Sequence, residues 1–350
     1  MKRGRWALRA GFCAALLAKV VSPGCAAGDD PPSKINSLRV LAVTADKPYA
    51  APGETIHFSM EVHDGGGSGQ PVEITWIGGC FDPEGDLYYA CFEDLAGAFT
   101  EEAGGGSEVT IAQGQGLTEF SLTLPEDIIS RRPPPAAGPH YGIAYLFFIA
   151  CAGTLKYMPE AASGEAGSVS LPFGCFDENG ARLGADRFVP GYTQIYSFAD
   201  GRGNENPKVE GFLFNGAPAP EDDDALPVVK TCPLSEDERR ASGCSADDPF
   251  DVCPAFPIDV IVDPSVAELD PGATTPEGDV LREIVWVGYF ADKGDIDGDT
   301  ALVSGAVEGF HGDHGARWIA PAEPGITTLW AIARDSRGGT TVLRRRVRVE

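Results

Sequence analysis

Short segments in which apolar and polar residues alternate dominate the chain from residue 38 onward. In residues 55–62, for example, Ile56, Phe58 and Met60 are separated by polar side chains. A period of two is typical of strands that bury one face. The same pattern, or a short apolar run between turn residues, predicts further strands at residues 38–43, 72–77, 108–112, 117–124, 141–151 and 168–173.

The segment from residue 142 to residue 152 is apolar almost throughout. A membrane-spanning helix needs about 20 apolar residues, so this segment is too short to cross a bilayer in that form. A strand buried on both faces accounts for its composition instead.

The second half of the chain repeats this organisation. Strands are predicted at residues 209–214, 258–262, 284–288, 327–334 and 341–349. The polar, glycine-bearing residues 335–339 predict the turn of a closing hairpin. Residues 284–288 also echo residues 74–78, and both segments contain a tryptophan, Trp286 and Trp76. We expect each indole to lie in a core between two sheets.

These patterns predict an all-β protein of two tandem immunoglobulin-like β-sandwich domains. The 44 glycines and 28 prolines cluster between apolar runs, where they mark turns. We place the first sandwich at residues 36–200 and the second at residues 201–350. An insertion at residues 217–256, which has an acidic run and three cysteines, interrupts the second. Ser235 and Glu238 fit a capping box, so a short helix is expected there.

The first thirty residues have the order of an export signal rather than of a folded element. Basic residues are followed by an apolar run, and Gly24 stands directly before Cys25. This resembles bacterial lipoprotein signal peptides, which implies a signal peptide at residues 1–24, a lipid on Cys25 and a tether at residues 25–35. The alanine after Cys25 favours the outer membrane by the family rule. The alternative is ordinary cleavage after Ala27, which yields a secreted protein.

The charge of the chain excludes nucleic acid as a partner. The first 24 residues contain five basic and no acidic side chains, so 22 basic and 52 acidic residues remain, a formal charge of −30. So acidic a surface repels nucleic acid and anionic lipid headgroups.

The cysteines predict disulfides, as is usual in an exported protein. Seven lie beyond Cys25: Cys80, Cys91, Cys151, Cys175, Cys232, Cys244 and Cys253. Local pairing favours Cys80–Cys91 and Cys151–Cys175, with one pair among the last three and one thiol left over. The close Cys-x-x-Cys pairs of a zinc site are absent.

Several segments resemble uncharacterised bacterial lipoproteins with tandem immunoglobulin-like or PKD-like domains. The matching segments are residues 38–43, 51–54, 191–196, 204–207 and 330–339. The resemblance implies two sandwiches on a lipid anchor, but it brings no established activity with it.

Two segments offer candidate binding chemistry. Asp295, Asp297 and Asp299 alternate as calcium ligands do, although the spacing departs from an EF-hand and a solvated hairpin tip is the alternative. Tyr88 and Tyr89 lie in the loop closed by Cys80 and Cys91. Their rings suit stacking on sugars, or alternatively packing over the disulfide.

The chain has no nucleophile elbow, no His-Glu-x-x-His and no phosphate-binding glycine loop. We therefore expect a lipid-anchored, non-catalytic cell-envelope protein that needs no cofactor beyond the candidate calcium. It would present two sandwiches for binding or scaffolding to envelope protein or glycan, on the periplasmic or outer surface. One alternative is a hydrolase that uses carboxylates in an inter-domain cleft. The other is a structural envelope component without a specific ligand.

Overall fold

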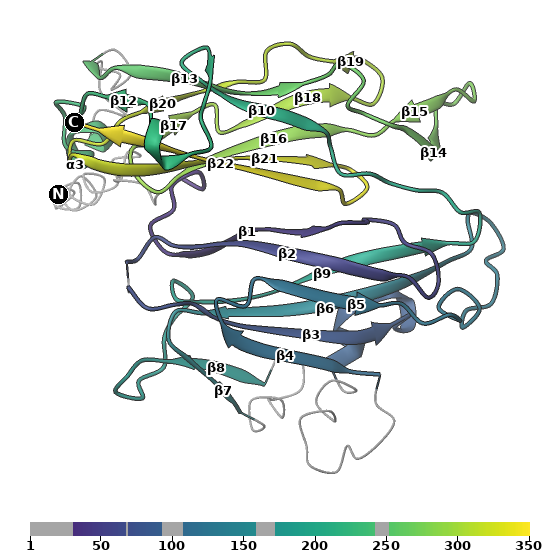
Figure 1. Cartoon of the computed structure of the whole chain (residues 1–350). Helices are drawn as coiled ribbons and strands as arrows, with labels where there is room; N and C mark the ends of the chain where they lie inside the picture. The colour runs from purple at the N-terminus through teal and green to yellow at the C-terminus, as the bar shows by residue number, and fades with distance from the viewer. Residues whose placement is uncertain (1–30, 68, 93–107, 159–171, 242–251) are drawn as a thin grey trace, which may run out of the picture.

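The computed structural model describes residues 31–67, 69–92, 108–158, 172–241 and 252–350. These residues form two β-sandwiches that stack as four successive β layers (Figure 1). The prediction of an all-β, immunoglobulin-like tandem is confirmed. Among these residues no helix is long and apolar enough to cross a membrane.

The first sandwich packs a three-stranded sheet on a four-stranded one. The smaller sheet is formed by β1 (Leu38–Ala45), β2 (Thr55–Asp64) and β5 (Glu119–Thr123). The larger sheet is formed, in spatial order, by β4 (Thr110–Gln115), β3 (Glu73–Phe81), β6 (Tyr141–Cys151) and β9 (Phe188–Phe198). Trp76 lies fully buried between them, as predicted, and its ring stacks on Phe120 at a centroid distance of 5.7 Å. Its Nε1 donates to the carbonyl of Leu117 at 2.8 Å.

Strand β6 is buried on both faces, as its composition predicts. Its inner side chains join the sandwich core, whereas Ile143, Tyr145 and Phe147 belong to a second cluster on the outside of the sheet. Additional elements cover parts of this outer face. They are η1 (Glu84–Asp86), η2 (Tyr88–Cys91), β7 (Thr154–Tyr157) and β8 (Phe173–Phe176).

Among the described residues, three disulfides join neighbouring elements, which confirms the prediction of disulfide bonding. Cys80–Cys91 ties η2 to β3, and Cys151–Cys175 ties β6 to β8. Cys232–Cys253 closes the insertion of the second sandwich. The predicted lipidation site, Cys25, and the remaining candidate, Cys244, lie outside the described residues.

The second sandwich consists of a five-stranded and a six-stranded sheet. The first contains β11 (Ala217–Pro218), β10 (Val209–Phe214), β13 (Ala255–Val262), β20 (Ala316–Ile319) and β17 (Asp295–Asp297). The other contains β12 (Val228–Val229), β22 (Thr340–Val349), β21 (Gly325–Asp335), β16 (Val285–Ala291), β18 (Thr300–Gly305) and β19 (Gly309–Phe310). A hairpin of β14 (Leu269–Thr274) and β15 (Val280–Arg282) extends from one end (Figure 1). The predicted closing hairpin is β21–β22, and the predicted short helix is α3 (Glu236–Ala241), capped reciprocally by Ser235 and Glu238.

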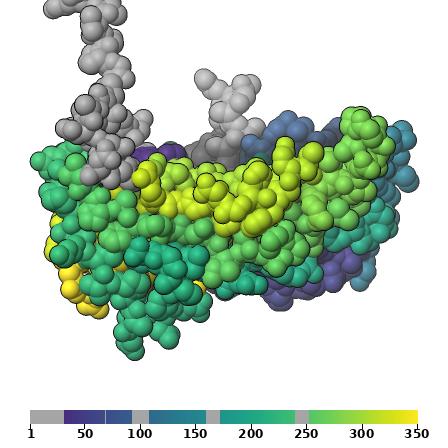
Figure 2. Space-filling model, turned by 90° about the horizontal axis from the view of Figure 1, so that it is seen from above, coloured from purple at the N-terminus to yellow at the C-terminus, as the bar shows by residue number. Residues whose placement is uncertain are grey.

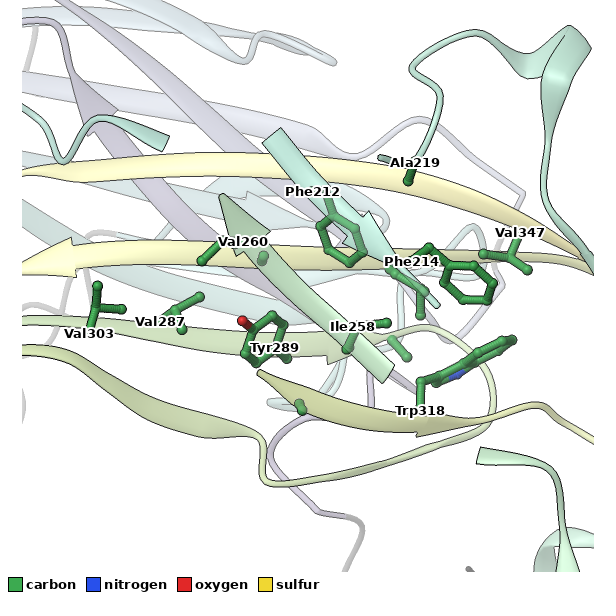
Figure 3. Packing of buried hydrophobic residues seen from close by; sticks show 14 of the residues in the cluster. Phe212, Phe214, Ala219, Ile258, Val260, Val287, Tyr289, Val303, Trp318 and Val347 are labelled. Atoms are coloured by element: carbon green, nitrogen blue, oxygen red, sulfur yellow. The ribbon is translucent and has the colours of Figure 1, made fainter. Parts of the chain in front are cut away.

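The prediction that Trp286 fills the second core is wrong. Trp318 lies there instead, beside Phe212, Phe214 and Tyr289 (Figure 3). In β16 the odd-numbered residues face the core, so Trp286 points to the opposite face and is only half-buried. Side chains alternate strictly along a strand, and a shift of one residue therefore moves a tryptophan out of the core.

The two sandwiches are packed directly against each other. Ile35, Leu41 and Ala42 form one buried cluster with Trp330 and Ile332 of β21. Seen from above, the second sandwich covers the first, whose purple and blue atoms show mainly at the rim (Figure 2). The first described residues and the C-terminus lie at one end of the molecule, whereas β3 and β9 both run toward the other end (Figure 1).

Candidate functional site

Three partly exposed tyrosines meet on the face of the first sandwich that is turned away from the second. Tyr88 and Tyr89 come from η2 and are 37% and 48% exposed, and Tyr192 of β9 is 45% exposed. Tyr88 stacks on Tyr192 at a centroid distance of 4.5 Å, and Tyr89 contacts Tyr88 edge-on at 5.6 Å. Together with Leu87, which is 42% exposed, we call these residues the aromatic surface. Contiguous exposed apolar groups of this kind mark interaction sites.

The rings of the aromatic surface rest on a rigid layer. Tyr145 and Phe147 of β6 are buried and contact the ring of Tyr192 at 5.6 and 6.1 Å. Phe92 packs on Phe147 at 5.5 Å. Phe92 thus packs on the sheet, whereas Tyr88 and Tyr89 of the same loop are accessible to solvent.

Two aspartates hold the loop that carries Tyr88 and Tyr89. Asp82 and Asp86 have φ angles of 50° and 58°, a conformation that costs energy outside glycine. Arg132 contacts both carboxylates, at 2.7 and 2.5 Å. Tyr141 donates to the Asp86 carboxylate at 2.6 Å, and Tyr145 donates to the Asp86 carbonyl at 2.8 Å. These bonds stabilise a strained loop, so the aromatic surface is preorganised.

Burial and hydrogen bonding shift the pKa values of this network. Burial raises the pKa of Asp82 above its ordinary value, despite the bonds from Arg132. Burial also acts on Asp86, but the hydrogen bonds from Arg132 and Tyr141 prevail and lower its pKa. Burial raises the pKa of Tyr145 to about 12, so its hydroxyl remains a donor at neutral pH.

A second candidate is a pocket of about 810 Å³ where the sandwiches meet. Tyr49, Glu268 and Arg337 are among its lining residues. Arg337 is buried, donates to Glu283 at 2.7 Å and pairs with Glu268. Burial raises the pKa of Glu283, which is only 2% exposed. The carboxylates of Glu268 and Glu283 thus both bind the buried Arg337, so their role is structural.

Two of the three aspartates predicted to bind calcium are paired with arginines. Asp295 accepts from Arg239 at 2.5 Å, and Asp297 pairs with Arg317. Among the described residues, no group of three or more His, Cys, Asp or Glu side chains is placed to hold a metal ion. Calcium binding at Asp295, Asp297 and Asp299 would therefore require these arginines to be displaced.

Sequence reasoning found Tyr88 and Tyr89 but missed Tyr192, with which they associate. A signal is present in the sequence, because Tyr192, Gln194 and Tyr196 alternate within residues 188–198. Only the pairing of β9 with β6 places Tyr192 beside η2.

No known family model and no curated protein matches this chain. Solved structures align with it at low similarity. Dimeric latent PorU from Porphyromonas gingivalis is 10% identical with a TM-score of 0.21, and the alignment covers 91% of this chain and 24% of that one. The E. coli alpha-2-macroglobulin is also 10% identical with a TM-score of 0.21, covering 90% of this chain and 17% of that one. A 1.5-MDa bacterial ice-binding adhesin is 9% identical with a TM-score of 0.18, covering 89% and 66%. This chain thus spans about a quarter of latent PorU, and alignments this weak support no inference about function.

Proposed function

We propose that this protein is a lipid-anchored, non-catalytic component of the cell envelope that binds another envelope component through the aromatic surface. The observation that carries this proposal is that the rings of Tyr88, Tyr89 and Tyr192 contact one another, are exposed to solvent and rest on buried side chains. Tyrosines fixed in this way supply contact area at low entropic cost, which is why binding sites use them.

Two further features support a position outside the cytoplasm. The three disulfides in the described part of the chain suit an oxidising compartment. The leader that precedes Cys25 has the order of a lipoprotein signal, and the alanine after Cys25 favours the outer membrane. Secretion after cleavage at Ala27 is the alternative outcome.

Co-sedimentation with envelopes tests the binding role. The purified chain of residues 26–350, which carries no lipid that would itself insert into membranes, should sediment with isolated envelopes of the producing bacterium. In this form Tyr88→Ala/Tyr89→Ala should weaken the binding to envelopes about tenfold at an unchanged melting temperature. Phe310→Ala is the matched control, because Phe310 is an exposed aromatic residue of the second sandwich, and it should bind as the wild type does. Equal sedimentation of the double variant and the wild type would show that the aromatic surface is not the binding site.

Metabolic labelling with a radioactive fatty acid tests the anchor separately. The wild type should carry label and fractionate with the membrane, and Cys25→Ala should lose both properties. An unlabelled wild type found in the medium would establish the secreted alternative and leave the binding proposal to the sedimentation assay.

A further inference from the structure

The aromatic surface continues as a row of side chains along β9. Tyr192, Gln194, Tyr196 and Phe198 occupy alternate positions, so they share one face of the strand. At about 3.3 Å per residue, the row extends roughly 20 Å from Tyr192 to Phe198. β9 is the edge strand of its sheet. Among the described residues, the backbone pairing on its open side is limited to Tyr49 and Ala50.

Ring contacts make this row continuous with the junction pocket. Tyr196 and Phe198 stack at 5.8 Å, and Tyr49 contacts both rings, at 6.0 and 4.9 Å. Tyr141 of β6 supports the same two rings from the neighbouring strand, at 5.7 Å from each. Tyr49 also lines the pocket between the two sandwiches.

Polar groups are interspersed with the rings. Gln194 is exposed and donates to the Tyr196 hydroxyl at 3.0 Å. Burial raises the pKa of Tyr196, and it raises that of Tyr49 to about 12, so both hydroxyls stay protonated at neutral pH. The row therefore offers apolar ring area together with neutral hydrogen-bonding groups.

We infer that the aromatic surface and the β9 row form one elongated site for a linear, uncharged polysaccharide chain. The inference rests on the proposed function and names its ligand class. Sugar rings present apolar C–H faces that pack on aromatic rings, and their hydroxyls require polar partners such as Gln194. A row of similar groups at a regular spacing matches a polymer of repeating units.

The charges near the row favour a neutral chain over an anionic one. Arg132 is paired with Asp82 and Asp86, and Arg202 with Asp200 at 2.5 Å. These cations are therefore already neutralised within the protein. The formal charge of −25 on the whole chain also repels anionic polymers.

Isothermal titration calorimetry of the purified mature protein tests this inference, with chitohexaose and cellohexaose as probes and the corresponding trisaccharides as short controls. At least one hexasaccharide should bind about tenfold more tightly than its trisaccharide, because the shorter chain cannot span the row. Tyr192→Ala should lower the hexasaccharide affinity about tenfold, while Phe310→Ala should leave it unchanged.

A second variant keeps the test independent of folding. Tyr192 contacts buried rings, but Gln194 is exposed, so Gln194→Ala should preserve the melting temperature and still weaken hexasaccharide binding. Failure of both hexasaccharides to bind, or equal affinity for the long and short chains, would overturn the inference. So would binding of decaproline that is lost in Tyr192→Ala, because it would assign the row to extended peptides. If envelopes still bind through Tyr88 and Tyr89 in either case, the proposed function stands and only the ligand class is wrong.

Discussion

The indole Nε1 of Trp330 donates a 2.7 Å hydrogen bond to the carboxylate of Glu61, a residue 269 positions earlier in the chain. Glu61 belongs to β2 of the first sandwich and Trp330 to β21 of the second. His63 packs edge-on against the same indole at 4.9 Å. Arg334 adds a bond across the interface by donating to the carbonyl of Leu41 at 2.6 Å. These contacts hold the two sandwiches together through specific, packed side chains.

Trp330→Phe should destabilise the protein by about 1–3 kcal/mol, because the partly buried Glu61 carboxylate loses its hydrogen bond from the indole and keeps only the longer ion pair with Arg344 at 3.7 Å. Urea unfolding measures the change. Trp286→Phe is the control, because Trp286 lies half-buried on the same face of this sheet and its indole donates to no group among the described residues. This substitution should cost less. Equal losses in the two variants would mean that the bond to Glu61 contributes nothing specific.

Arg337→Gln should cost about 3–5 kcal/mol at neutral pH, because it leaves the Glu283 carboxylate buried without its cation. Burial already raises the pKa of Glu283, so the native state binds its proton more tightly than the unfolded state does. The stabilising effect of that proton is present at acidic pH and is lost as the pH rises through the folded pKa. The deficit of the variant should therefore shrink between pH 7 and pH 5 in urea unfolding.

Arg202→Gln supplies the comparison for Arg337→Gln. Its partner Asp200 is about half exposed, so this ion pair should contribute less than about 1 kcal/mol to the free energy of unfolding. A deficit of Arg337→Gln that is equally small, or that grows on acidification, would contradict the assigned role of Glu283.

The protein should lose stability between about pH 10 and pH 12. Burial raises the pKa of Tyr49 and of Tyr145 from the ordinary 10.0 to about 12. Between these values only the unfolded state ionises, so stability that is complete below pH 10 is lost as the pH rises through the folded pKa. Urea unfolding at pH 9 and pH 11 measures the loss, and Tyr49→Phe should remove part of it. A loss of the same size in Tyr49→Phe would show that this hydroxyl is not responsible.

Removal of the Cys80–Cys91 bond should reduce both stability and envelope binding. Cys80→Ala/Cys91→Ala should lose about 3 kcal/mol in urea unfolding on the chain-entropy model. Binding should fall as well, because the bond ties η2, with Tyr88 and Tyr89, to β3. Cys232→Ala/Cys253→Ala is the control in the second sandwich, and it should lose stability but not binding. Unimpaired binding by the Cys80/Cys91 variant would show that η2 keeps its conformation without the disulfide.

EDTA should leave the melting temperature of the purified protein unchanged. The reason is that Arg239 and Arg317 already neutralise Asp295 and Asp297. Differential scanning calorimetry with EDTA and then with added calcium measures this. A rise in the melting temperature on addition of calcium that is abolished in Asp295→Asn/Asp297→Asn would instead establish the calcium site.

The alternation of side chains by itself determined the fold class and many of the strands, because apolar residues at every second position bury one face of a strand whatever its neighbours are. It did not predict β18 or β20, the strand that carries Trp318. Residues 55–62 and 141–151 are strands as predicted. Local spacing was also sufficient for the bonds Cys80–Cys91 and Cys151–Cys175, whose partners are 11 and 24 residues apart.

Strand pairing and domain packing decided the rest. The period of two is the same for both faces of β16, so the sequence could not show that Val285 and Val287 face the core while Trp286 faces outward. Tyr88 meets Tyr192, and Trp330 meets Glu61, across more than a hundred residues. Contacts at such separations depend on which strands pair and which sheets stack, and a local pattern of hydrophobic positions contains neither.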